Sequence, residues 1–248
     1  MRNLEIKNTD CHAALAMTKN AQSGRSMIEM LGVLAIIGVL SVGGNAGYSK
    51  AMTKYRINKT IEQITLIAGN VRAFWGSQKN YEGVYCSSNN DGTCPASGCN
   101  GQSVGDGCPI VKKAKIFPDE MITVTDGKIM SINNPFGSGV SLYLVDKSQR
   151  NDNQAFCIYY YINNEETCIE LLSQDWSSAN VKAIDVTGDS GDYDVLLKTP
   201  VSVDKAVEVC SKAIEEDSAL YDSDNIHLTF YFDVDVNSEY WKNYTWAN

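Results

Sequence analysis

The feature that most constrains this chain is a long apolar run near its N-terminus. The run covers residues 30–44, reads MLGVLAIIGVLSVGG, and contains one side-chain hydroxyl, at Ser41. A helix that crosses a bilayer needs roughly 20 residues, so the run alone is short. Extension to residues 27–46 gives that length and brings Glu29 into the segment. The sequence therefore predicts an apolar N-terminal helix that carries one carboxylate.

The carboxylate of Glu29 is the anomaly of this segment. A charge inside a membrane costs about 2.5–3.5 kcal/mol on insertion scales, so it usually has a partner and a function. The alternative is that Glu29 lies at the membrane interface and stays hydrated. A secretory signal peptide does not fit, because the first 24 residues have no apolar core and carry Glu5 and Asp10. A helix that stays attached to the chain fits better.

Residues 23–30, SGRSMIEM, followed by LGVLAIIGVLSV, resemble the class III signal peptide of type IV pilins and pseudopilins. The resemblance implies that a prepilin peptidase cuts after Gly24, so that Glu29 becomes the fifth residue of the mature chain. It also implies that the apolar stretch becomes the N-terminal half of a long helix. Arg25 departs from the family's pattern, in which the residue after the cut is usually hydrophobic. Methylation of Arg25 is left open.

The same resemblance gives Glu29 a role in assembly. Cleavage creates a free α-amine, and Glu29 of one subunit would pair with this amine on a neighbour, because an unpaired buried charge is costly. The implied partners are further copies of the chain, the prepilin peptidase and the assembly platform of the inner membrane. The implied location is the inner membrane of a Gram-negative envelope with a periplasmic C-terminal domain, and an extracellular pilus after assembly.

The apolar pattern continues beyond the first run. Apolar residues recur at steps of 4, 3, 4, 3 and 4 positions, namely at Ile57, Ile61, Ile64, Ala68, Val71 and Trp75. This spacing predicts one face of an amphipathic helix, with Gln63 and Arg72 among the residues off that face. No proline occurs between Gly24 and Pro95, so we expect one helix from about residue 26 to about residue 76. Glycines at 43, 44 and 47 have two interpretations. They form a point where the helix bends or melts on assembly, or they reflect the ordinary glycine content of membrane helices.

The segment after this helix is rich in Gly, Ser and Asn and holds four cysteines, Cys86, Cys94, Cys99 and Cys108. Four cysteines can pair in three ways, and the expected location is an oxidising compartment. We therefore expect disulfides and leave their pairing open. Zinc is disfavoured because the spacings lack paired C-x2-C clusters.

The rest of the chain predicts an α+β domain. A hairpin is expected over residues 121–132, strands at 140–145, 155–162 and 226–234, and helices at 164–176 and 202–214. The expected fold is a long N-terminal helix packed on an antiparallel β-sheet with short helices. The expected segments are a leader at 1–24, a membrane-embedded helix half at 25–47, an amphipathic half at 48–79, a Cys-rich loop at 80–117 and the α+β domain at 118–248.

The order of elements in this domain resembles the globular domain of type IVb pilins. The resemblance implies a disulfide between Cys168 and Cys210 that bounds a C-terminal region. The chain has eight cysteines, and Cys11 would leave with the leader, so the number that remains is odd. Cys157 lies among apolar residues and is expected to be a buried free thiol, with pairing to a loop cysteine as the alternative.

The charged residues and the candidate catalytic residues predict no enzyme site. Four aspartates, at 185, 189, 192 and 194, are expected to form a solvated acidic loop, with calcium as the alternative that no EF-hand pattern supports. The net charge of −9 argues against nucleic-acid binding. His227 would be the one histidine of the mature chain, and its pairing with Cys157 as a nucleophile is disfavoured. Common catalytic motifs are absent. We expect no enzyme, no cofactor and no metal.

These observations predict a structural subunit of a type IV pilus, of the type IVb kind. The filament would serve adhesion, aggregation, motility or uptake. One alternative is a minor pilin or a type II secretion pseudopilin. An alternative of another class is a membrane-anchored extracytoplasmic binding domain that does not polymerise.

Overall fold

The computed structural model describes residues 27–78, 81, 84, 114–125, 128–145, 155–188, 193–218 and 225–237. The chain divides into two compact units, Met1–Tyr48 and Ser49–Asn248, each of which is treated by itself. Several expectations fall outside the described residues. They are the leader with its cleavage site at Gly24 and Arg25, the pairing of the loop cysteines Cys86, Cys94, Cys99 and Cys108, and two aspartates, Asp189 and Asp192.

Helix α1 spans Met27–Trp75 and continues through the glycines at residues 43–47. The expected long helix is therefore confirmed. In its C-terminal half, residues 49–75, five apolar side chains are fully buried: Ile57, Ile64, Ile67, Ala68 and Val71. Ile61 and Trp75 pack partly buried against the same core. The amphipathic face is thus confirmed, with one exception, since Gln63 was expected off it and is buried.

The N-terminal half of α1, residues 27–48, belongs to the other unit. Its large apolar side chains from Met30 to Leu40 are exposed. Within the described part of the chain, no helix is long and apolar enough to cross a membrane. The membrane-embedded half expected at residues 25–47 stays a prediction.

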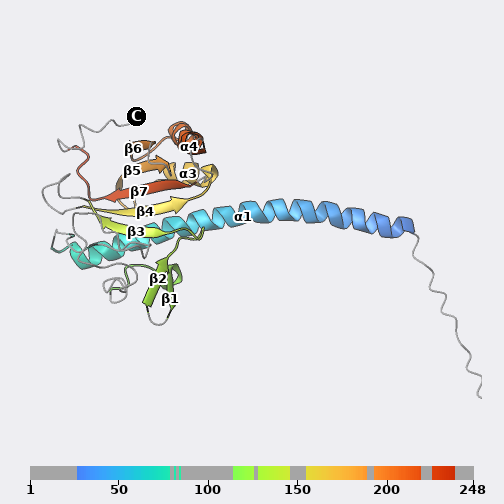
Figure 1. Cartoon of the computed structure of the whole chain (residues 1–248), viewed down its shortest axis with the longest axis horizontal. Coiled ribbons are helices and arrows are strands. Elements are labelled where there is room, and N and C mark those ends of the chain that lie inside the picture. Colours follow the sequence, from blue (N-terminus) through green and yellow to red (C-terminus); the bar gives the residue numbers. More distant parts are fainter. Residues whose placement is uncertain are drawn as a thin grey trace, which may run out of the picture. The chain divides into compact units, whose positions relative to one another are not determined.

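In the described part of the chain the strands form two antiparallel sheets (Figure 1). A short helical turn, Asp119–Met121, leads into the hairpin of β1 (Ile122–Thr125) and β2 (Lys128–Ile132), as the sequence predicts. The larger sheet has the order β3-β4-β7-β5-β6. Its strands are β3 (Val140–Leu144), β4 (Phe156–Ile162), β5 (Val181–Gly188), β6 (Asp194–Lys198) and β7 (Ile226–Phe232). The last strand of the described residues, β7, therefore lies at the centre of the sheet.

Two short helices follow the expected caps. The helix α3 (Glu165–Leu172) begins after Asn164, whose Oδ1 accepts a hydrogen bond from the Thr167 N–H at 2.7 Å. The helix α4 (Val203–Ser218) begins after Ser202, whose Oγ accepts from the Lys205 N–H at 3.3 Å. Both caps satisfy backbone donors that a helix start leaves without partners. The two helices contact each other, and α4 also contacts β5 and β7.

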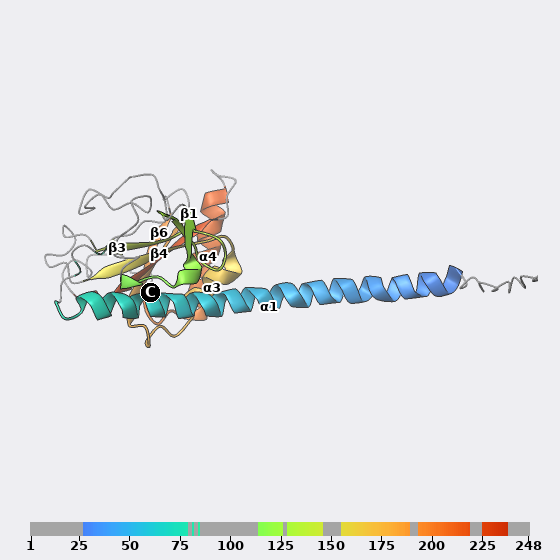
Figure 2. The ribbon, with the colours of Figure 1, turned by 90° about the horizontal axis from the view of Figure 1, so that it is seen from below.

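The main core lies on one face of the larger sheet. Alternate residues of β4 and β7, such as Phe156, Tyr160, Phe230 and Phe232, join the buried residues of α1, α3 and α4 in one cluster. Figures 1 and 2 both place the C-terminal half of α1 alongside this sheet. The opposite face carries a second, smaller cluster around Cys157, Ala183 and Leu196. The α+β fold with a helix packed on an antiparallel sheet is confirmed.

One expectation about the fold is wrong. The acidic segment from Asp185 to Asp194 was expected to be a loop, but Asp185 lies within β5 and Asp194 begins β6. The two strands pair in antiparallel register, with Thr187 opposite Asp194 and Leu196 opposite Asp185. Aspartate is disfavoured in strands, so the aspartates led to the prediction of a loop although apolar residues alternate along the segment.

Candidate functional site

In its N-terminal half, α1 is apolar on all sides between Met30 and Leu40. The large apolar side chains of this stretch are 53% to 74% exposed; they are Met30, Leu31, Val33, Leu34, Ile36, Ile37, Val39 and Leu40. A helix that is apolar all round is normally buried in lipid or among other helices. Glu29 lies in the first turn of α1 and is exposed. An acid in the first turn interacts favourably with the helix dipole, and here it also borders the apolar surface.

The C-terminal end of α1 is fixed to the sheet by one arginine. Nε and Nη2 of Arg72 donate to the two carboxylate oxygens of Asp233, at 3.1 Å and 3.0 Å. Its Nη1 donates to the Ala179 carbonyl oxygen at 2.9 Å. The guanidinium lies 5.8 Å and 5.5 Å from the ring centres of Phe156 and Phe232. Bidentate ion pairing and cation–π attraction thus act together at this point.

Two further side chains complete the bonding of Asp233. The Tyr81 hydroxyl donates to Oδ2 at 2.6 Å, and Nδ2 of Asn180 donates to Oδ1 at 3.2 Å. Burial and the neighbouring Asp233 raise the pKa of Tyr81, so its hydroxyl keeps the proton that it donates. Asn180 and Asp233 both have left-handed backbones, with φ of 57° and 58°, a region that Asn and Asp tolerate. We call Arg72, Tyr81, Asn180 and Asp233 the Asp233 network.

Other polar contacts hold the C-terminal half of α1 in place. The Tyr160 hydroxyl donates to Oε1 of Gln63 at 3.1 Å inside the core. Asn70 donates to the carbonyl oxygens of Lys115 and Ile116, both at 3.1 Å. The buried Gln63 therefore has a partner that sequence periodicity did not reveal. These bonds fix the rotation of the helix as well as its position.

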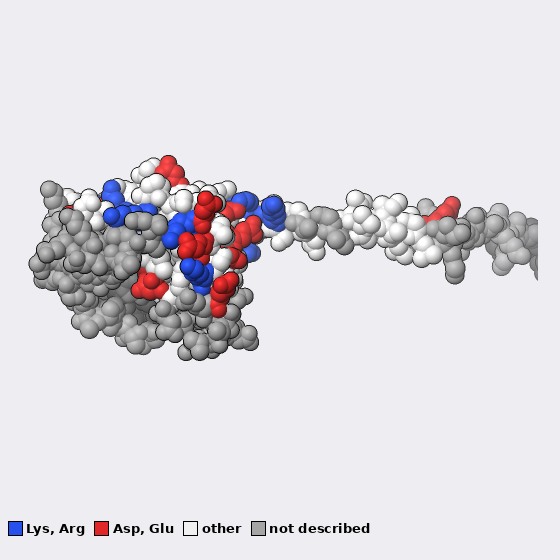
Figure 3. Space-filling view, turned by 90° about the horizontal axis from the view of Figure 1, so that it is seen from above, with Lys and Arg blue, Asp and Glu red and all other residues white. Residues whose placement is uncertain are grey.

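Ion pairs connect α1 to its neighbours at the surface. Lys54 pairs with Glu170 of α3. Lys59 lies 3.1 Å from Glu62 and 3.0 Å from Glu120, and Glu120 contributes most to the raised pKa of Lys59. Figure 3 shows that acidic and basic side chains also lie next to one another on the face of the domain that it presents. Exposed pairs of this kind contribute little to stability.

The disulfide that the resemblance implied joins Cys168 of α3 to Cys210 of α4, with 5.9 Å between the Cα atoms. Cys157 is a buried free cysteine. Burial raises the pKa of its thiol to about 12, so the thiol is protonated and unreactive at neutral pH. His227 lies opposite Tyr161, whereas Cys157 lies opposite Tyr231, four residues along β7. That offset separates the two residues by roughly 13 Å and leaves no Cys–His pair.

The carboxyl groups of Asp185 and Asp194 are diagonal neighbours across β5 and β6. Burial first, and then the hydrogen bond with Asp194, raise the pKa of Asp185 well above its usual value. The Thr187 hydroxyl also donates to Oδ2 of Asp185 at 3.2 Å. The pair fits one shared proton. Among the described residues, no group of three or more His, Cys, Asp and Glu is arranged to hold a metal.

Comparison with known proteins adds the family. Residues 49–232 match the family model described as Bundlin. The chain belongs to the Bundlin family of type IVb pilins. The solved type IVb pilin of Salmonella typhi is 14% identical, with 71% of this chain and 99% of that chain covered at a TM-score of 0.42. None of the curated proteins compared with this chain matches it.

Membership of the Bundlin family accounts for much of this arrangement. Bundlins are structural subunits, so the prediction that the chain is not an enzyme is confirmed. The family also implies self-assembly into filaments and an extracellular pilus. The matched residues include the C-terminal half of α1, both sheets, the disulfide and Arg72, and end just before Asp233. Sequence reasoning missed the Asp233 network, because its members are up to 161 residues apart.

Proposed function

We propose that this Bundlin is the subunit of a type IVb pilus, made as a prepilin, cut after Gly24 and polymerised through the N-terminal half of α1. The observation that carries the proposal is the apolar surface of residues 30–40, which is exposed on all sides and borders Glu29. Packing among the helices of neighbouring subunits would remove this surface from water. Burial of apolar area is the dominant favourable term in association.

Glu29 would set the axial position of each subunit. Cleavage leaves an α-amine on Arg25, and the apolar surroundings of the filament core make an unpaired carboxylate expensive. The Glu29 carboxylate of one subunit would therefore pair with the α-amine of the next. Before assembly, the inner membrane would hold the same apolar helix, where the prepilin peptidase and the assembly platform act on it. The pilus would then serve adhesion, aggregation, motility or uptake.

Co-assembly of variant and wild-type subunits tests this proposal. Glu29→Ala subunits should enter sheared filaments at about a tenth of the wild-type level or less, since a lost charge pair of about 1.4 kcal/mol already gives tenfold. The matched control is Glu62→Gln, an exposed acid of the same helix whose partner Lys59 keeps Glu120. N-terminal sequencing of the filament subunit should begin at Arg25.

Three results distinguish the alternatives. Equal incorporation of Glu29→Ala and wild-type subunits would reject the assembly role of Glu29. An uncut chain in a strain with active prepilin peptidase would favour a membrane-anchored binding domain that does not polymerise. Processed subunits that remain rare within filaments made of another protein would favour a minor pilin or a secretion pseudopilin.

A further inference from the structure

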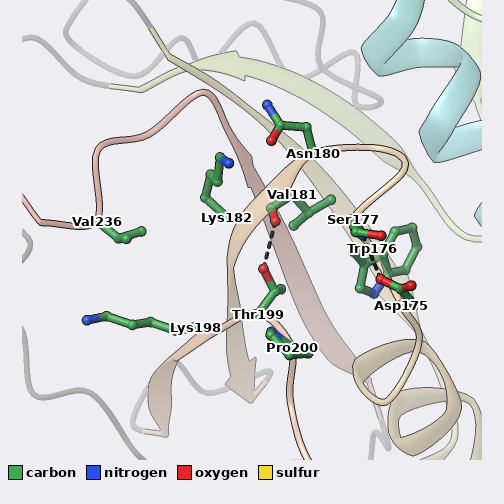
Figure 4. Close-up of a pocket in the computed structure, with 10 residues that line it drawn as sticks. All are labelled: Asp175, Trp176, Ser177, Asn180, Val181, Lys182, Lys198, Thr199, Pro200 and Val236. Atoms are coloured by element: carbon green, nitrogen blue, oxygen red, sulfur yellow. Dashed lines mark hydrogen bonds between the residues drawn. The ribbon is translucent and has the colours of Figure 1, made fainter.

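A cavity of about 460 Å³ opens at the edge of the domain where β5 begins and β6 ends. Its wall comes from the α3–β5 connection, the first residues of β5, the end of β6 and the residues that follow it (Figure 4). Nine of the ten lining residues lie between the disulfide partners Cys168 and Cys210. The disulfide therefore anchors both ends of the segment that forms the wall. A volume of this size suits a small ligand.

A β-bulge positions Lys182 at this cavity. The register of β5 against β7 passes from Val181 to Ala183 and leaves Lys182 as the extra residue. Bulges of this kind redirect a side chain away from the regular alternation. The Lys182 carbonyl still accepts the Thr199 N–H at 3.3 Å, so the backbone is held while the side chain is turned. Among the described residues, the Lys182 ammonium has no hydrogen bond or ion pair.

The polar groups of the cavity divide into two sides. Figure 4 shows Lys182 and Lys198 on one side of it and Asp175 with Ser177 on the other. The Ser177 hydroxyl and N–H lower the pKa of Asp175, which remains an ionised acceptor. Asn180 uses its amide N–H on Asp233, which leaves its carbonyl oxygen as an acceptor. One side thus offers positive charge, and the other offers acceptors for hydroxyl donors.

We infer that this cavity binds a small ligand that carries a carboxylate on a hydroxylated body, as an acidic monosaccharide does. The carboxylate meets Lys182, and the ligand hydroxyls donate to Asp175 and to the carbonyl oxygen of Asn180. Apolar side chains at Val181, Pro200 and Val236 cover the ring of the ligand. The chain carries a net charge of −9, so a pocket that presents ammonium groups stands out against the rest of the surface. The inference holds whether or not the chain polymerises.

Calorimetric titration of the full chain in detergent micelles tests the inference, with D-glucuronate as the probe. Glucose, acetate and inorganic phosphate are the comparison ligands. D-glucuronate should bind saturably and more tightly than all three. Lys182→Ala should weaken its binding by about tenfold, the usual effect of losing one charged hydrogen bond. Lys50→Ala is the matched control, because this exposed lysine of α1 lies outside the cavity and its removal changes the net charge equally.

Each other outcome overturns the inference. Equal weakening by Lys182→Ala and Lys50→Ala would mean general attraction to positive charge. Glucose binding as tightly as D-glucuronate would remove the role of the carboxylate, and acetate or phosphate binding as tightly would remove the role of the hydroxylated body. Lys182→Arg, which keeps the charge, provides the second variant if Lys182→Ala does not fold. It should retain saturable D-glucuronate binding, and loss of binding would reject a charge-based site.

Discussion

At the scale of single residues, Asp233 concentrates the contacts that fix α1 to the sheet. Its two oxygens accept from Arg72, Tyr81 and Asn180, which come from three separate parts of the chain. The side chains of Arg72 and Asp233 are about a quarter exposed, at 27% and 22%, so water screens the pair in part. A planar, bidentate donor is required here, and lysine cannot supply one.

Arg72→Lys is therefore expected to lower the free energy of unfolding by about 1–2 kcal/mol, because one of two charged hydrogen bonds and the ring contacts are lost. Urea denaturation followed by circular dichroism measures the change. The matched control is Arg56→Lys, an exposed arginine of α1, which should change stability by less than about 0.5 kcal/mol. Equal effects of the two substitutions would contradict the role given to Arg72.

Asp185 gives the domain a specific pH dependence. Its folded-state pKa is raised, so the folded protein holds a proton that the unfolded chain releases at about pH 4. Stability should therefore fall as pH rises from about 4 through the raised pKa of Asp185. Asp185→Asn should flatten this part of the stability curve, and the exposed Asp119→Asn should leave it unchanged. Denaturation midpoints measured from pH 4 upward decide the matter, and an unchanged slope in Asp185→Asn would refute the expectation.

At the scale of elements, the disulfide joins the helices α3 and α4. It closes a segment of 42 residues between Cys168 and Cys210. In the chain-entropy account, a closed loop of this length stabilises the folded state by roughly 4 kcal/mol, less any strain. The same segment contains β5, β6 and most of the cavity wall, so the bridge acts on the region that sequence reasoning described least well.

Replacement of both cysteines, Cys168→Ala with Cys210→Ala, should lower the free energy of unfolding by about 2–4 kcal/mol. The loss should exceed that of Cys157→Ala, which removes a buried thiol but no bridge. Chemical denaturation of the two variants side by side provides the measurement. A double variant no less stable than Cys157→Ala would show that the disulfide does not contribute to the free energy of unfolding.

The elements that the sequence predicts are those whose signals are local. The periodicity from Ile57 to Trp75 predicts the buried face of α1, and Asn164 predicts the start of α3, because each depends on residues within a few turns. Strands β5 and β6 were not predicted, because they contain Asp185 and Asp194, a residue type that strands disfavour. The two carboxyl groups are tolerated here because they share a proton across the strands. The Asp233 network and the cavity were not predicted either, because each forms from segments that are distant in the sequence and meet only in the fold.

At the scale of the whole molecule, the two units differ in what they expose. The unit Ser49–Asn248 has its own core, to which the C-terminal half of α1 contributes Ile57, Ile64 and Ile67. The N-terminal half of α1 exposes the apolar side chains from Met30 to Leu40. Contiguous exposed apolar surface of this kind marks an interaction site.

A chain of residues 49–248, secreted to an oxidising compartment, should therefore fold and remain monomeric. A chain of residues 25–248 should associate or require detergent, because it retains the exposed apolar helix. Sedimentation velocity of both chains measures the difference. Circular dichroism and intact disulfides serve as the control for folding of the shorter chain. Association of both chains to the same extent would place the interaction surface in the domain instead.

The central place of β7 has a consequence for how a copy of this protein is made. Residues 226–232 bridge β4 on one side and β5 on the other, although both of these strands precede them in the sequence. Without them the sheet would consist of two separate pairs, β3 with β4 and β5 with β6, each with an open edge that can pair with foreign strands. A chain cut before residue 226 would lack the strand that joins the two pairs, and its open strand edges would make it prone to aggregation.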